Sequence, residues 1–206
     1  MPSAPATYLV DDDSAIRDSL SLWLGMRGIR CVAYESAEAF LAAAQPDWRG
    51  CVLIDLQLEG ISGLQLQSEL AERNITMPVI FVTGHGDVGA ARDALKAGAL
   101  DFIEKPVDNE RLVELVGEAM ARDAEAAQRQ EQAALLAGRL QRLTQREREV
   151  MAQVVAGRHN REIAADLGIS PRTVEVYKSR LMDKLDVRRV ADLVKLALEA
   201  QADAQD

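Results

Sequence analysis

Short apolar runs alternate with amphipathic stretches over the first 120 residues of the chain. Five of these runs are four to six residues long, contain β-branched or aromatic residues and are bounded by turn residues, which is typical of strands. They predict strands at Thr7–Val10, Ile29–Tyr34, Cys51–Ile54, Val79–Thr83 and Asp101–Glu104. Because a segment of helical length follows each run, the pattern predicts an α/β fold with a doubly wound, five-stranded parallel sheet.

The segments of helical length begin with residues that cap helices well, since their side-chain oxygens accept hydrogen bonds from unpaired backbone amides. The predicted starts are Ser14, Ser36, Ser62 and Asp87, and a fifth helix begins near Asp108. Three glycines fall near predicted helix ends, where left-handed backbone is common. They are Gly28, Gly50 and Gly98.

The fifth helix has no evident stop signal. No proline occurs between Arg111 and Leu143, and Ala121–Gln132 contains no large apolar residue before leucines return. The pattern favours a helical linker over residues 123–142, exposed to solvent. A second interpretation stays open, in which this long helix pairs with a second copy of the chain.

Four short helical segments follow the linker. Thr144 and Glu147 form a capping box for the first, which ends at Gly157. Asn160 is expected to cap the second, over 161–167, and Ser170 the third, over 170–185; the fourth covers 189–198. The second and third have helix-turn-helix spacing. An apolar stripe would pack this pair: Ile163, Ala164, Leu167, Val174, Leu181 and Leu185.

The charge of the chain is unevenly distributed. The composition is 48% hydrophobic and 28% charged, which suits packed globular domains, but a net charge of −9 argues against a nucleic-acid partner. Residues 1–120 carry 9 basic and 19 acidic residues, whereas residues 144–200 have an excess of two basic residues. This asymmetry indicates two domains with different partners.

The sequence predicts no membrane span, signal peptide, disulfide framework or cysteine metal site. No run reaches the roughly 18 apolar residues of a membrane span, and Met1–Thr7 lacks the basic and apolar parts of a signal peptide. Cys31 and Cys51 lie in apolar runs, which disfavours a disulfide framework or a cysteine metal site. We expect a soluble cytoplasmic protein with no membrane partner.

Acidic residues end two of the predicted strands. Asp11, Asp12 and Asp13 follow the first strand, and Asp55 ends the third. In parallel neighbouring strands these carboxylates converge, and they repel one another unless a cation neutralises them. Mg²⁺ suits such oxygen ligands and keeps water positions open for a phosphoryl ligand.

A hydroxyl and an ammonium complete this edge of the sheet. Thr83 ends the fourth strand and Lys105 the fifth, where both would contact phosphoryl oxygens. An ionised aspartate is itself a nucleophile that forms an acyl phosphate. Each feature alone usually has a structural explanation, such as a solvated turn. Their joint placement at the ends of different strands points to a phosphoryl site.

Four segments resemble the receiver domain of two-component response regulators, over residues 5–122, and their sequences are similar to those of the FixJ-like group. They are Leu9-Val-Asp-Asp-Asp, Leu53-Ile-Asp55-Leu, Val82-Thr83-Gly-His-Gly-Asp and Asp101-Phe-Ile-Glu-Lys105-Pro106. The resemblance implies strand order 2-1-3-4-5, a cis Lys105–Pro106 peptide, and Asp55 as the phosphoacceptor, loaded by a sensor histidine kinase or a small phosphodonor.

The resemblance also implies roles for the residues around Asp55. Asp11 and Asp12 would hold Mg²⁺ together with Asp55 and the backbone carbonyl of Gln57. Thr83 and Lys105 would contact the phosphoryl group. Phe102 would occupy the aromatic switch position on the fifth strand and would move with Thr83.

One loop departs from the receiver pattern. Receivers usually carry Met-Pro three and four residues after the phosphoacceptor, where this chain has Leu58-Glu59 followed by Gly60. A carboxylate beside an anion site predicts altered phosphoryl stability and kinase matching. Gln57 and His85 lie where the family tunes dephosphorylation, and we expect His85 to be an exposed loop residue rather than a catalytic base.

The tail resembles the LuxR/NarL-type DNA-binding domain, over residues 143–200. The segments are Leu143-Thr-Gln-Arg-Glu147-Arg-Glu-Val, Asn160-Arg-Glu-Ile-Ala and Ile169-Ser-Pro-Arg-Thr-Val-Glu-Val-Tyr-Lys. The resemblance implies that helix 170–185 enters the major groove and that the last helix supports dimers. The expected DNA-binding residues are Arg172, Thr173, Glu175, Val176, Lys178, Ser179 and Arg180. Short helices alone would favour a generic small helical bundle with a solvated charged face.

Together these features predict a transcriptional response regulator, not an enzyme, switched by Mg²⁺-dependent phosphorylation of Asp55. Its expected partners are a sensor histidine kinase, double-stranded promoter DNA and a second copy of the chain when phosphorylated, with RNA polymerase as a further candidate. Two alternatives stay open. One is a regulator that acts without phosphorylation, given Leu58-Glu59; the other is an aspartate-nucleophile phosphohydrolase, because Asp11 and Asp13 form an Asp-x-Asp pattern.

Overall fold

The computed structural model describes residues 4–84 and 88–202. The chain divides into two compact units, Met1–Ala127 and Gln128–Asp206. No helix in the described ranges combines the length and apolar character needed to span a bilayer.

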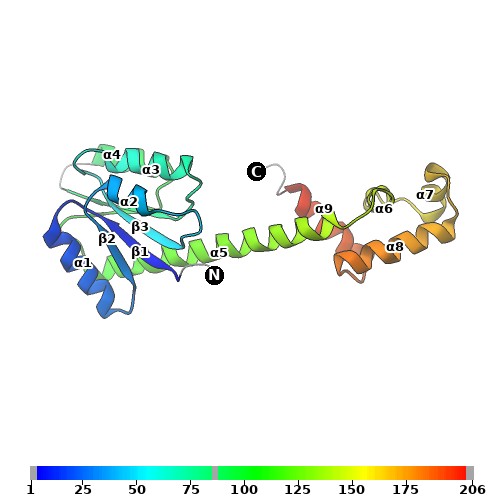
Figure 1. The fold of residues 1–206 in the computed structure, drawn as a ribbon, viewed down its shortest axis with the longest axis horizontal. Helices are drawn as coiled ribbons and strands as arrows, with labels where there is room; N and C mark the ends of the chain where they lie inside the picture. Colours follow the sequence, from blue (N-terminus) through cyan, green and yellow to red (C-terminus); the bar gives the residue numbers. More distant parts are fainter. Residues whose placement is uncertain (1–3, 85–87, 203–206) are drawn as a thin grey trace. The chain divides into compact units, whose positions relative to one another are not determined.

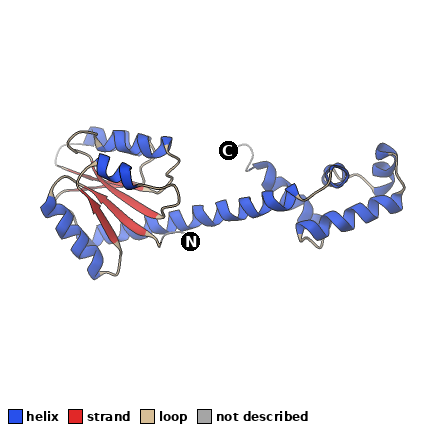
Figure 2. Ribbon diagram, viewed as in Figure 1, coloured by secondary structure: helices blue, strands red, loops and turns tan. Residues whose placement is uncertain are grey.

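The first unit is a five-stranded parallel sheet with helices on both faces (Figures 1 and 2). The strands lie in the order β2-β1-β3-β4-β5, which confirms the predicted fold class. Their bounds are β1 Ala6–Val10, β2 Cys31–Tyr34, β3 Gly50–Asp55, β4 Val79–Thr83 and β5 Asp101–Glu104. The helices are α1 Ser14–Met26, α2 Ala37–Ala43, α3 Gly63–Glu72, α4 Val88–Lys96 and the first part of α5, Asn109–Gln141.

The two faces of the sheet bury separate apolar clusters. Alternate residues along each strand point to opposite faces, so Tyr8 and Val10 pack on one side and Leu9 on the other. Helices α2, α3 and α4 cover the Tyr8 face, and α1 and α5 cover the Leu9 face. Because both faces are covered, the central strands β1, β3 and β4 are buried along their whole length, as is usual for parallel sheets.

Some predicted starts were wrong by one or two residues. Strand β2 begins at Cys31 rather than Ile29, because the Ile29 amide donates to the Leu24 carbonyl and closes the end of α1. Asp13, not Ser14, caps α1, since its carboxylate accepts from the Ala15 amide at 2.8 Å. Ser36 and Ser62 cap α2 and α3 as predicted. The expected start at Asp87 lies outside the described residues.

Gly50 begins β3 and does not end a helix, contrary to the prediction. Its φ of +125° is left-handed backbone, and a Cβ there would lie 1.9 Å from the Ala6 carbonyl oxygen. Gly50 is therefore required by the close approach of β1 and β3. Gly28 and Gly98 follow α1 and α4 with positive φ, as predicted.

Asp123 ends the buried face of α5 within the first unit. The preceding buried positions are apolar, and they are Leu112, Leu115, Val116 and Ala119. Asp123 is 4% exposed, and its Oδ2 accepts from the Gly50 amide at 2.9 Å, while Oδ1 is buried with no hydrogen-bond partner. Burial raises the pKa of the Asp123 carboxyl, against the lowering effects of the Gly50 amide and of Arg49.

We expect Asp123→Ala to destabilise the first unit by about 1–3 kcal/mol, because the buried Gly50 amide loses its acceptor. Asp123→Asn keeps a carbonyl acceptor there. In the wild type the pKa of Asp123 is raised by folding, so the free energy of unfolding falls as pH rises from the ordinary pKa of aspartate through the pKa of Asp123 in the folded state. The Asn variant should lack this loss. Urea denaturation followed by fluorescence checks both variants, since both tryptophans, Trp23 and Trp48, lie in this unit.

The second unit is helical. It contains the end of α5, then α6 Gln145–Val155, α7 Asn160–Leu167, α8 Pro171–Leu185 and α9 Val190–Ala202. The predicted stripe is confirmed in its core: Ile163, Ala164, Val174, Leu181 and Leu185 are buried, and Leu167 packs against them half-buried.

Capping defines the helices of the second unit. Thr144 and Glu147 form the predicted capping box of α6, and Ser170 caps α8 with Pro171 in the first turn. The buried Glu147 carboxylate also accepts from Lys184 Nζ at 2.6 Å, which ties α6 to α8. The prediction for α7 was wrong, because His159 occupies the N-cap position and Glu162 accepts from its amide at 2.7 Å.

Candidate functional site

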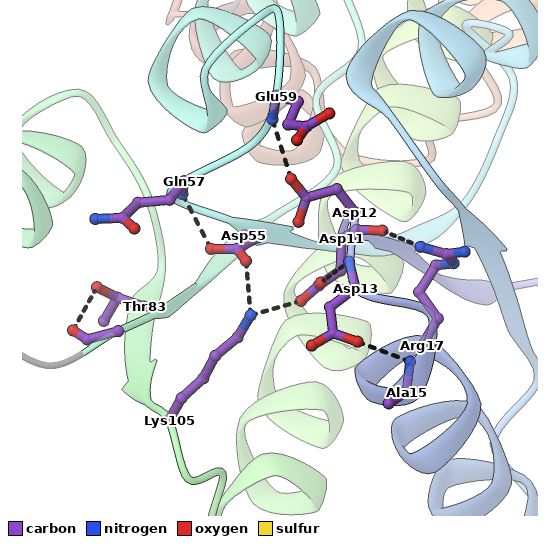
Figure 3. A network of polar contacts seen from close by, with 11 residues as sticks. Asp11, Asp12, Asp13, Ala15, Arg17, Asp55, Gln57, Glu59, Thr83 and Lys105 are labelled. Atoms are coloured by element: carbon purple, nitrogen blue, oxygen red, sulfur yellow. Dashed lines mark hydrogen bonds and ion pairs between the residues drawn. The ribbon is translucent and has the colours of Figure 1, made fainter.

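Four charged side chains meet at the carboxyl ends of three strands in the first unit (Figure 3). Asp11 and Asp12 follow β1, Asp55 ends β3 and Lys105 follows β5. The register explains the meeting: Val10 pairs with Ile54 in adjacent strands, so Asp11 comes level with Asp55. We call Asp11, Asp12, Asp55 and Lys105 the acid pocket.

Lys105 joins two of the carboxylates directly. Its Nζ lies 2.6 Å from Asp55 Oδ2 and 2.9 Å from Asp11 Oδ2. Asp11 is fully buried and Asp55 is 6% exposed, so these contacts lie in a setting that screens charge poorly. The Lys105–Pro106 peptide is cis, as the resemblance implies.

The charges of the pocket do not balance. Three carboxylates face one ammonium, and one oxygen each from Asp11, Asp12 and Asp55 lie within 4.8 Å of one another. Burial raises the pKa of Asp11, although Lys105 and the Asp13 amide oppose this. Burial lowers the pKa of Lys105, but the hydrogen bonds to Asp55 and Asp11 outweigh it and raise the pKa. The donor set suits a hard divalent cation such as Mg²⁺.

Backbone amides hold the other oxygens of the pocket. Asp11 Oδ1 accepts from the Asp13 amide at 2.9 Å, and Asp55 Oδ1 accepts from the Gln57 amide at 3.0 Å. Asp12 Oδ2 accepts from the Glu59 amide at 3.2 Å. The loop after β3 is therefore bound to two carboxylates of the pocket through its backbone. The contact between Asp12 and Glu59 joins residues far apart in sequence, and no local pattern predicted it.

Thr83 and Gln57, also predicted for this site, lie beside the acid pocket (Figure 3). Thr83 is 2% exposed at the end of β4, and its hydroxyl donates to the Gly84 carbonyl at 3.3 Å. Phe102 is half-buried and packs against the core cluster under α2, α3 and α4. The Gln57 side chain is exposed. His85 lies outside the described residues.

Helices α7 and α8 form the helix-turn-helix of the second unit. Gly168, with φ +65°, ends α7 in left-handed backbone and turns the chain towards α8. The predicted DNA-binding residues lie on α8, where Arg172, Glu175, Val176, Ser179 and Arg180 are exposed and Thr173 and Lys178 are half-buried. Val176 is 44% exposed, on the side of α8 opposite its buried residues Val174, Leu181 and Leu185.

Lys178 has a protein partner that the sequence did not suggest. Its Nζ donates to Asn160 Oδ1 at 3.2 Å and so joins α8 to the start of α7. Asn160 was predicted as a helix cap, but it is the first residue of α7 and carries this contact instead. An asparagine before a helical run is a typical cap signal, so the sequence pattern favoured the wrong role.

Comparisons with known proteins agree with both parts of the structure. Residues 8–117 match the model of the response regulator receiver domain, and residues 141–197 match that of the bacterial regulatory proteins of the luxR family. The chain is 43% identical over 200 residues to the transcriptional regulatory protein FixJ of Azorhizobium caulinodans, covering 97% of this chain and 95% of that protein.

A second FixJ and two solved structures give the same picture. FixJ of Rhizobium meliloti is 44% identical over 192 residues, covering 93% of this chain and 94% of that protein. The structure of the response regulator StyR superposes with a TM-score of 0.88 at 34% identity, covering 96% of this chain and all of that one. Full-length FixJ from B. japonicum gives a TM-score of 0.59 at 36% identity, covering 97% of this chain and 98% of that one.

Proposed function

This chain is a two-component response regulator of the FixJ-like group, a transcription factor in which a receiver is joined to a LuxR-type DNA-binding domain, and from that premise we propose how its residues carry the switch. The receiver covers residues 5–122, residues 123–142 form a helical linker, and residues 143–200 bind DNA. A sensor histidine kinase is the phosphodonor, and promoter DNA is the target. The protein acts in the cytoplasm.

Asp55 is the phosphoacceptor in this proposal. One of its carboxylate oxygens attacks the phosphorus of a phosphohistidine, the P–N bond breaks, and the imidazole leaves with its electron pair. Lys105 Nζ is 2.6 Å from Asp55 Oδ2, and its positive charge offsets the negative charge that the phosphoryl group brings. This contact, at the meeting of three strand ends, is the observation that carries the proposal.

Asp11, Asp12 and Asp55, with the backbone carbonyl of Gln57, would hold Mg²⁺. When bound, the cation would neutralise the negative charge of the phosphoryl oxygens. The support is the donor set itself, three acidic oxygens within 4.8 Å of one another. Asp13 lies outside this set because its carboxylate caps α1, which weighs against the Asp-x-Asp arrangement of a phosphohydrolase. We therefore propose a regulator and not an enzyme.

Thr83 and Phe102 transmit the change. Binding of the Thr83 hydroxyl to a phosphoryl oxygen requires it to leave the Gly84 carbonyl, 3.3 Å away. Phe102 is half-buried in the adjacent strand, and we propose that it moves as Thr83 moves. The phosphorylated state must differ from the resting state in the free energy of dimerisation or of contact between the domains for DNA binding to change. Dimers bind two half-sites and gain affinity from the link between them, and RNA polymerase is a further candidate partner.

DNA footprinting across the genome, with and without a phosphodonor such as acetyl phosphate, tests this function. We expect sites with two related half-sites that are protected much more strongly with the phosphodonor present. Equal protection in both conditions would instead support a regulator that acts without phosphorylation. Protection of no site would contradict the assignment of the second unit to DNA binding.

A further inference from the structure

Carboxylates from the end of β3, from the β1–α1 loop and from α2 bind the loop between β3 and α3. The Gln57 amide donates to Asp55, the Glu59 amide to Asp12, and the Ile61 amide to Glu38 Oε1 at 3.3 Å. Every second amide from 57 to 61 is therefore held by an acid. This loop contains the Leu58-Glu59-Gly60 stretch that departs from the receiver pattern.

Glu38 differs from the other two acids in its position. It lies in the first turn of α2, exposed to solvent, and it does not belong to the acid pocket. The hydrogen bond from its own backbone amide is the main cause that holds the pKa of Glu38 below its usual range; burial opposes it, and the Ile61 amide adds to the lowering. Glu38 is therefore ionised at neutral pH and accepts hydrogen bonds strongly.

Gly60 gives a second, independent sign of this contact. Its φ is +79°, and a Cβ at this position would lie 2.7 Å from Glu38 Oε1. A side chain at residue 60 would be strained by the backbone and would also displace the Glu38 carboxylate. The glycine in this loop and the glutamate on α2 therefore fit one another.

We infer that Glu38 is a positioning residue for phosphorylation, which keeps the β3–α3 loop in place when the acid pocket is in use. The inference rests on the proposed function. A cation and a phosphoryl group compete with the loop amides for Asp12 and Asp55. Glu38 is free of that competition because it lies outside the pocket, so its hold on Ile61 persists. A loop kept in place presents the Gln57 carbonyl to the cation without a further loss of backbone freedom.

Glu38→Ala, Glu38→Gln and Gly60→Ala in the full-length chain test this inference, with Glu72→Ala as the control. Glu72 is an exposed glutamate at the end of α3, so this control removes the same charge. Calorimetric titration with MgCl₂ should show about three- to fivefold weaker binding in Glu38→Ala and Gly60→Ala, as expected for loss of one exposed hydrogen bond. Glu38→Gln should stay within about twofold of the wild type, because its amide oxygen still accepts.

Hydrogen exchange of the metal-free chain supplies a readout that needs no cation. The Ile61 amide should exchange faster in Glu38→Ala and Gly60→Ala than in the wild type or Glu72→Ala. The melting temperature should be unchanged in Glu38→Ala and lower in Gly60→Ala, because a side chain at residue 60 strains the left-handed backbone. The inference is overturned if Glu38→Ala has the same Mg²⁺ affinity and the same Ile61 exchange rate as Glu72→Ala. It is also overturned if Glu38→Gln binds Mg²⁺ as weakly as Glu38→Ala does. A wild type that binds no Mg²⁺ but shows the exchange difference would instead reject the proposed cation site.

Discussion

An Asp55→Asn variant is expected to lose all labelling by acetyl phosphate or by a phosphorylated kinase. The asparagine amide is not a nucleophile under these conditions. Lys105 contacts the carboxylates of Asp11 and Asp55 in the wild type, and in this variant it keeps the contact with Asp11. Phosphodonor-dependent DNA binding should be lost with the label. Mass spectrometry of the peptide that contains residue 55, before and after treatment, measures the result.

Asp13→Asn is the matched control for Asp55→Asn. It makes the same change in a neighbouring acid, and asparagine caps a helix as well as aspartate does, so α1 should be unaffected. This variant should be labelled like the wild type. Persistent labelling of Asp55→Asn at another residue would reject Asp55 as the phosphoacceptor.

A Lys178→Ala variant is expected to bind promoter DNA about tenfold more weakly, with a shallower dependence on salt. Each lysine that contacts a phosphate adds about one to the slope of log K against log salt. In the free protein Lys178 is half-buried and bonded to Asn160, so contact with DNA requires its ammonium to exchange this partner for a phosphate. Fluorescence anisotropy at several salt concentrations measures both the affinity and the slope.

Asn160→Ala separates the two roles of Lys178. It removes the partner in α7 and keeps the positive charge on α8, so it should leave the salt slope unchanged. If Lys178→Ala also leaves the slope unchanged while weakening binding, Lys178 acts by joining α7 to α8 and not by contact with phosphate.

The sequence was sufficient for the fold because the deciding signals are local. Alternating strand and helix lengths, with caps such as Ser62 and Thr144, define where the elements form and that the sheet is parallel. Some errors were shifts of a cap or a strand start by one or two residues, and two others arose where a contact between elements decides the outcome. A Cβ at Gly50 would clash with Ala6 in the next strand, and Asn160 accepts a hydrogen bond from Lys178 in another helix.

The acid pocket was predictable because strand ends in a parallel sheet share one edge, so that Asp11, Asp55 and Lys105 had to lie close together. The side-chain partners within that edge were not predictable in the same way. Nothing in the pattern around Glu38 or Asp12 indicates which loop amide each will bind, since those contacts depend on the path of the loop after β3.

The most direct test of the switch is a crystal structure of the full-length chain with MgCl₂ and beryllofluoride, a stable mimic of the phosphoryl group. The predicted result is Mg²⁺ on Asp11, Asp12, Asp55 and the Gln57 carbonyl, and beryllofluoride bound to an Asp55 oxygen in contact with Thr83 and Lys105. Beryllofluoride on a different residue, or a cation held away from these aspartates, would contradict it.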